Sequence, residues 1–170
     1  MEALDAVFSR RSIRHYTADE VPEELVHELL RAAMSAPSAH NKQPWHFVII
    51  DERGILNEVA QVHPWANMLR EAPLAILVCG DLHIDNGVGF WIQDCAAATQ
   101  NILIAAHAKG LGAVWVGIYP AAEKSAALIS RLINMPEYII PLSLIPVGYP
   151  AEKKSPVNRY DPTKIHRNNW

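Results

Sequence analysis

Hydrophobic residues recur at helical spacing in several parts of the chain, most regularly between residues 22 and 35. The apolar positions of that segment are Leu25, Val26, Leu29, Leu30 and Ala33. This spacing predicts an amphipathic helix. Residues 17–20 resemble a capping box ahead of it, and Pro22 suits its first turn. Further helices are predicted over residues 2–9, 53–62, 88–109 and 121–133.

The predicted helix over 88–109 differs from the others because it is rich in alanine and apolar nearly all round. Such a helix belongs in a core or an interface. Gly110 follows it and is a favourable residue just beyond a helix C-terminus.

Uninterrupted runs of β-branched, aliphatic and aromatic residues predict buried strands. These runs lie at residues 46–51, 74–80, 113–118 and 142–147. No strand is followed by a glycine-rich GxGxxG turn, which argues against a dinucleotide-binding Rossmann domain. The polar, proline-bracketed stretch over 35–45 is predicted to be a loop.

The composition is that of one compact domain, with 170 residues of which half are hydrophobic. A net charge of -3 argues against a nucleic-acid partner. The acidic N-terminus is unlike a secretory signal, and no run reaches the ~18 apolar residues of a membrane span. We therefore expect a cytoplasmic protein without a membrane partner, in which Cys79 and Cys95 are buried and reduced.

The usual catalytic motifs are missing: there is no GxSxG, no HExxH and no P-loop. The histidines also lack metal-ligand spacing with a supporting carboxylate. If the chain is an enzyme, a bound cofactor is expected to carry the reaction.

A cluster of guanidinium groups on an acidic chain is the first candidate for binding chemistry. It comprises Arg10, Arg11, Ser12 and Arg14. Three arginines around a hydroxyl can cradle a phosphate dianion through charge-assisted hydrogen bonds. The alternative is a helix end whose charges are all solvated.

The loop before the first predicted strand is the second candidate. Asn41 and Gln43 each carry an amide that can both donate and accept, as recognition of a heterocycle edge requires. Its alternative role is that of an ordinary connector. The polar tail over 151–170 is either disordered or docked on a partner subunit, and Tyr160, Ile165 and Trp170 favour docking.

These segments together resemble the nitroreductase family of FMN-dependent NAD(P)H oxidoreductases. The likeness runs through RRSIRHY, APSAHNKQPWHFVII, QDCAAATQNILIAAHAKGLGAVWVG, IPVGYPAEKK and the final KIHRNNW, in this order. It implies an α+β fold, with a central mixed sheet flanked by helices, in an intertwined homodimer. Residues 1–170 would form a single domain of minimal length, and 151–170 would wrap the partner subunit.

The resemblance also implies roles for the arginine cluster. Arg10 and Ser12 would hold the phosphate and ribityl end of FMN, and Arg11 would contact the ribityl chain or phosphate through its backbone. Arg14 would lie near the N1 and O2 edge of the flavin, where reduction places negative charge. Arg159, in the tail, would complete the phosphate site.

Other site residues follow from the same resemblance. Pro37, Ser38 and Ala39 would come from the other subunit, with Asn41 and Gln43 close by. The segment Trp115, Val116 and Gly117 would pass the flavin ring, where a main-chain N–H can reach N5. Larger members carry a glutamate in this segment, and this chain does not.

The implied activity is transfer of hydride from NADH or NADPH, through FMN, to a small electron-poor acceptor such as a nitroaromatic or a quinone. Two alternatives stay open at this point. One is a specialised branch of the family, performing reductive dehalogenation or flavin fragmentation. The other is a flavin-binding, redox-sensing protein without efficient turnover.

Overall fold

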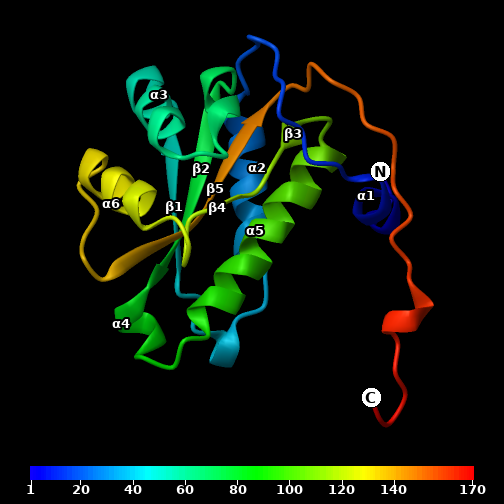
Figure 1. Cartoon of the computed structure of the whole chain (residues 1–170). Coiled ribbons are helices and arrows are strands. Elements are labelled where there is room, and N and C mark those ends of the chain that lie inside the picture. Colours follow the sequence, from blue (N-terminus) through cyan, green and yellow to red (C-terminus); the bar gives the residue numbers. More distant parts are fainter.

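The computed structural model describes residues 1–170 and has three layers, with a β-sheet between two layers of helices (Figure 1). The strands are β1 (Trp45–Ile50), β2 (Leu74–Asp81), β3 (Gly112–Ala113), β4 (Val116–Gly117) and β5 (Ile139–Gly148). The helices are α1 (Ala3–Ser9), α2 (Glu23–Met34), α3 (Arg53–Val62), α4 (Leu82–Asp85), α5 (Trp91–Ala108) and α6 (Glu123–Leu132). Single 3-10 turns are η1 (Ala39–Asn41), η2 (Asn67–Arg70) and η3 (Pro162–Lys164).

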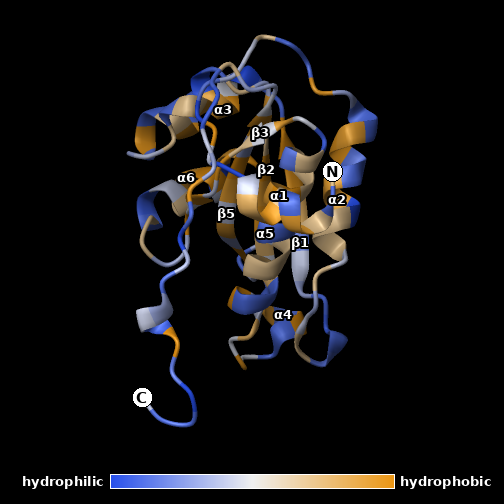
Figure 2. Ribbon diagram, turned by 90° about the vertical axis from the view of Figure 1, so that its right-hand side faces the viewer, coloured by the Kyte–Doolittle hydropathy of each residue, from blue (hydrophilic) through white to orange (hydrophobic).

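The central strand β2 shows how the two layers of helices share one sheet. Its side chains alternate, as those of any strand do, so that Ile76 joins the core beneath α2 and α5 while Leu77 joins the core beneath α3 and α6. Both faces are covered, which is why every residue of β2 is buried and the run is continuously hydrophobic. Figure 2 shows this hydrophobic centre in the strands.

The predicted buried thiols are confirmed, because Cys79 and Cys95 are free and buried. Burial raises the pKa of each thiol to about 12. Both therefore stay protonated near neutral pH.

The sheet is antiparallel at every pairing, and the expectation of a mixed sheet within this chain is wrong. Its strand order is β1-β2-β5-β3, with β4 also paired to β5. Ile50 lies opposite Ala75, so the connection that contains α3 and η2 begins and ends at one end of the sheet. Such a return reverses the strand direction, whereas a parallel neighbour needs a crossover along the whole sheet.

Two of the predicted strands differ in detail from the structure. β1 lies at the sheet edge with partly exposed central residues, so it is not a buried strand. The predicted strand over 113–118 is interrupted between β3 and β4. The register continued from β3 and β4 puts Val114 opposite Pro146. Proline has no N–H to donate, so the ladder is broken there.

The predicted helices are present, with corrections at two N-termini. Thr17 bonds Asp19 locally instead of capping α2, which starts after Pro22 without a side-chain cap. The helix expected from residue 88 begins at Trp91, because buried Asp85 accepts the backbone N–H groups of Gly89 and Trp91. Gly110 adopts the left-handed conformation beyond its end, as predicted. None of the helices has the length and hydrophobicity needed to cross a bilayer.

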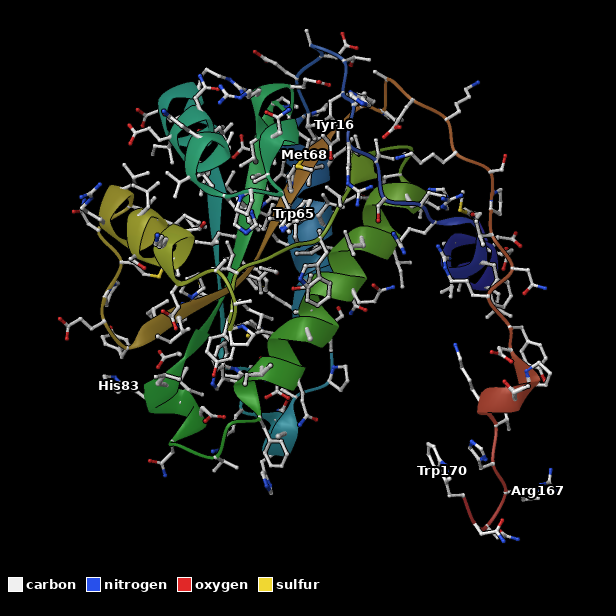
Figure 3. All side chains as sticks on the ribbon, viewed as in Figure 1. Tyr16, Trp65, Met68, His83, Arg167 and Trp170 are labelled. Carbon is white, nitrogen blue, oxygen red and sulfur yellow. The ribbon has the colours of Figure 1, made fainter.

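The two ends of the chain run side by side before they separate. Thr17 donates to the Tyr149 carbonyl and Ala151 donates to the His15 carbonyl, so residues near 15–17 pair with 149–151. Tyr16 is buried at this junction and donates its hydroxyl to the Ile13 carbonyl, 2.7 Å away. Beyond the junction, the tail passes α1 and leaves the body of the chain (Figures 1 and 3).

Gly80 in β2 provides a test of the packing between the sheet and α5. A Cβ added there would lie 2.2 Å from the Trp91 ring, whereas one added at Gly54 in α3 meets nothing closer than 3.5 Å. We expect Gly80→Ala to lower the free energy of unfolding by about 1–3 kcal/mol through overpacking. Gly54→Ala should raise it by about 0.5–1 kcal/mol, because alanine is the better helix former. Urea unfolding measures both, and equal effects of the two substitutions would contradict this account of the packing.

Candidate functional site

The arginine cluster lies in the extended segment that leaves α1, and the tail fixes its backbone. The guanidinium of Arg11 donates to the Ser155 carbonyl. Arg14 donates its backbone N–H to Glu152 at 2.6 Å, and Lys154 reaches the Ser12 carbonyl at 2.9 Å. These contacts use main-chain groups and the side chain of Arg11. The side chains of Arg10, Ser12 and Arg14 form no hydrogen bond or ion pair within the chain.

Positive charges from both ends of the chain lie close together here. Burial lowers the pKa of the Arg10 guanidinium, and the neighbouring charges of Arg159 and Arg11 lower it further. Burial and the charge of Arg10 likewise lower the pKa of His107, at the end of α5. No carboxylate pairs with Arg10 or Arg159. We call Arg10, Arg11 and Arg159 the arginine site; its uncompensated charge suits an anion.

A pocket of about 540 Å³ contains Arg14 and lies along the sheet edge formed by β4 and the two residues before it. We call it the edge pocket. Its lining residues are Arg14, His63, Pro64, Trp65, Asn67, Met68, Val114, Trp115, Val116 and Gly117. It thus brings together Arg14 and the segment Trp115, Val116 and Gly117, which the sequence had singled out separately.

The ladder between β4 and β5 determines what this edge offers to a ligand. Ile118 donates to the Leu142 carbonyl at 2.9 Å, so these two residues form a hydrogen-bonded pair. Antiparallel pairs alternate, and the N–H and C=O of Gly117 therefore point away from β5. By the same alternation, those of Trp115 also face outward. The edge accordingly carries unpaired main-chain N–H groups at Trp115 and Gly117.

Gly117 leaves room beside this edge. A Cβ built on it would meet no atom within 4 Å, so the position is open and the backbone can be approached closely. Val116, in contrast, has a buried side chain, so it can offer a ligand little beyond its main chain. Trp115 is 37% exposed.

The far wall of the edge pocket was not found from the sequence. It is formed by His63, Pro64 and Trp65, directly after α3, and by Met68 in η2 (Figure 3). The same wall separates the edge pocket from a neighbouring pocket of about 430 Å³ beside the start of α6. The only sequence signal was the run HPW at the end of a predicted helix, which does not reveal what lies opposite.

His63 connects this wall to β4. It is 3% exposed and ends α3, and its Nε2 lies 3.0 Å from the Gly117 carbonyl. Its Nδ1 lies 3.2 Å from the backbone nitrogen of Trp65. The outward-facing carbonyl of Gly117 therefore has the His63 imidazole as its partner.

The loop over 37–43 lies at the other end of α5 from the arginine site. Ala39 donates to Asp94 near the start of α5, whereas Ser9 contacts His107 near its end. Thirteen residues of α-helix separate these two anchors by about 20 Å. Within one chain, Pro37, Ser38 and Ala39 therefore do not join the arginine site.

The polar groups of this loop are largely paired with one another. Ser38 accepts the backbone N–H of Gln43, and the Gln43 amide donates to the Asn41 amide oxygen at 3.0 Å. Asn41 and Gln43 both have left-handed backbone conformations, with φ of 55° and 50°. Such conformations are uncommon for residues other than glycine and mark a specifically shaped loop.

A family model, relatives in sequence and solved structures all match this chain to the same family. A model of the Nitroreductase family matches residues 7–75 and 57–149. A protein of Methanothermobacter thermautotrophicus, provisionally named NADH dehydrogenase/NAD(P)H nitroreductase, is 48% identical over 170 residues, which are 100% of this chain and 88% of the relative.

Solved structures agree with these matches. A protein of Bacteroides thetaiotaomicron with the same provisional name has a TM-score of 0.94 and 45% identity, covering 99% of this chain and 98% of its own. A provisionally named nitroreductase from Desulfovibrio desulfuricans, solved in complex with FMN, has a TM-score of 0.88 and 31% identity, covering 100% and 98%. The α+β fold expected from the resemblance is therefore confirmed.

Proposed function

The chain belongs to the nitroreductase family, and from this premise we propose that it is an FMN-dependent oxidoreductase. It takes hydride from NADH or NADPH and delivers it to nitroaromatic, quinone or similar electron-poor acceptors by a ping-pong mechanism. The observation that carries this proposal is the pairing of an uncompensated arginine site with the edge pocket, joined by one extended segment of chain.

The donor set fits FMN in charge and in shape. A phosphate needs charge-assisted donors, and Arg10 and Arg159 have no partner within the chain. A flat ring needs a pocket with a closely approachable backbone, which Gly117 provides. Residues 10 and 14 are four apart in an extended segment, so their Cα atoms are at most about 14 Å apart. One ligand with a phosphate at one end and a ring at the other suits this spacing.

Bound FMN supplies a ring that accepts hydride at N5 and passes it to an acceptor, and the chain supplies binding and orientation. Arg14 places a fixed positive charge in the edge pocket, where negative charge on the ring is stabilised. The free N–H of Gly117 offers a hydrogen bond to an electron-rich ring atom. Trp65 and Trp115 line the pocket and offer apolar ring surface to the flavin.

A second copy of the chain is part of this proposal. The loop over 37–43 is expected to reach the same FMN from another subunit, because about 20 Å of α5 separate it from the arginine site within one chain. Exposed apolar residues on α1 and in the tail offer surface for that partner. They are Leu4, Val7, Phe8, Val157, Tyr160, Ile165 and Trp170.

The first prediction concerns cofactor binding. The purified protein should be yellow or should take up added FMN with quenching of flavin fluorescence. Arg14→Ala combined with Arg159→Ala should weaken FMN binding at least a hundredfold, because it removes a charge at each end of the site. Arg31→Ala, at an exposed position of α2, is the control and should bind normally. Equal affinity in the double variant and the control would show that the site is wrongly placed.

The second prediction concerns the electron donor. Under anaerobic conditions, NADH or NADPH should bleach the visible absorbance of the bound oxidised FMN, as dithionite does. An excess of a quinone or nitroaromatic should then restore the absorbance. If only dithionite bleaches the protein, the nicotinamide part of the proposal fails. If bleaching occurs but steady-state turnover is negligible, the chain is a flavin-binding module instead.

The third prediction concerns assembly. Light scattering should give about twice the chain mass of 18.9 kDa. Deleting residues 157–170 should produce a monomer, because it removes the apolar tail residues and leaves intact the pairing of the two chain ends near 15–17 and 149–151. A full-length chain that is monomeric at micromolar concentration would exclude a site shared between subunits.

A further inference from the structure

We propose that His63 is a positioning residue that makes Gly117 a pure hydrogen-bond donor toward the cofactor. The inference rests on the proposed FMN site and adds to it a role for His63, a residue of the pocket wall. His63 would act through Gly117, by occupying its carbonyl oxygen and leaving only its N–H free. The contacts of the imidazole carry this inference.

Both ring nitrogens of His63 have main-chain partners, and these fix its tautomer. The backbone N–H of Trp65 can only donate, so Nδ1, at 3.2 Å, must accept. Nε2 therefore carries the proton and donates to the Gly117 carbonyl at 3.0 Å. The imidazole is buried, and it joins α3 and the pocket wall to the sheet edge.

The effect on the edge follows from the alternation of the ladder. The N–H and C=O of Gly117 face outward together, so a ligand atom beside this residue would meet a donor and an acceptor. His63 removes the acceptor by bonding it. Trp115 keeps both of its outward groups, so it can donate and accept, whereas Gly117 can only donate.

An uncovered carbonyl at Gly117 would place the negative end of a dipole beside the cofactor. This unfavourable electrostatic interaction would be strongest with the more electron-rich, reduced form of FMN. Loss of the Nε2 donor should therefore weaken binding of reduced FMN more than binding of oxidised FMN. The midpoint potential of the bound FMN would then fall.

Two amide substitutions separate the two contacts of His63. In His63→Gln, the longer side chain brings an NH₂ near the place of Nε2 and keeps the donor to Gly117. In His63→Asn, the shorter side chain brings its oxygen near the place of Nδ1 and keeps the acceptor for Trp65. We expect His63→Gln to keep FMN affinity within about threefold. His63→Asn should favour the oxidised over the reduced form by about tenfold, which lowers the potential by about 30 mV for a two-electron couple.

The measurements are FMN affinity by fluorescence quenching and the midpoint potential by equilibration with reference dyes. His83→Gln and His83→Asn are the matched controls, because His83 stacks on Tyr138 away from the edge pocket (Figure 3). Neither control should change affinity or potential. Equal potentials for His63→Gln and His63→Asn, or a larger fall for His63→Gln, would overturn the inference.

A further measurement does not depend on the variants folding. Nitrogen-15 NMR of the wild-type chain should show the His63 proton on Nε2, and a proton on Nδ1 would overturn the inference. Failure of the wild-type chain to bind FMN would instead defeat the proposed function. The two failures are therefore distinguishable.

Discussion

The pairing of the two chain ends is the constraint on which the candidate site depends. Residues near 15–17 bond to 149–151, and Tyr16 is buried at the junction. Further along, Glu152 and Lys154 hold the main chain at Arg14 and Ser12. These tail contacts go to main-chain groups, so they fix the backbone of the segment and leave the side chains of Arg10, Ser12 and Arg14 without partners. An anion would therefore meet donors that start from a preorganised backbone.

A single proline determines the form of the sheet edge along the edge pocket. Pro146 cannot donate across the sheet, so the strand opposite is interrupted at Val114 and Trp115. The interruption leaves the edge short, open to a ligand and lined by outward main-chain groups. Exposed sheet edges invite pairing with other strands, and proteins usually cover or shorten them. Here Ile13 bonds the Ala113 carbonyl and His63 bonds the Gly117 carbonyl, so the edge is partly covered by the chain itself.

The sequence predicted most elements because local patterns decide them. The spacing of Val26, Leu29 and Ala33 suffices for α2, and the arginine cluster is visible as charge. The direction of the strands and the break at Pro146 were not predictable, since both depend on which residues lie opposite one another. The role of His63 was not predictable for the same reason. It depends on a contact with Gly117, which is 54 positions away along the chain.

The geometry of α5 links the site to assembly. One end of this helix contacts the loop over 37–43 through Asp94, and the other end contacts α1 through His107. About 20 Å of rigid helix separate them, so no loop motion of ordinary size joins the two sets of residues within one chain. If both sets bind one FMN, two copies must lie so that the start of α5 in one approaches the end of α5 in the other. A two-fold arrangement does this twice at once, so one contact surface completes two equivalent sites. Binding of FMN and association of the chains would then be coupled, each strengthening the other.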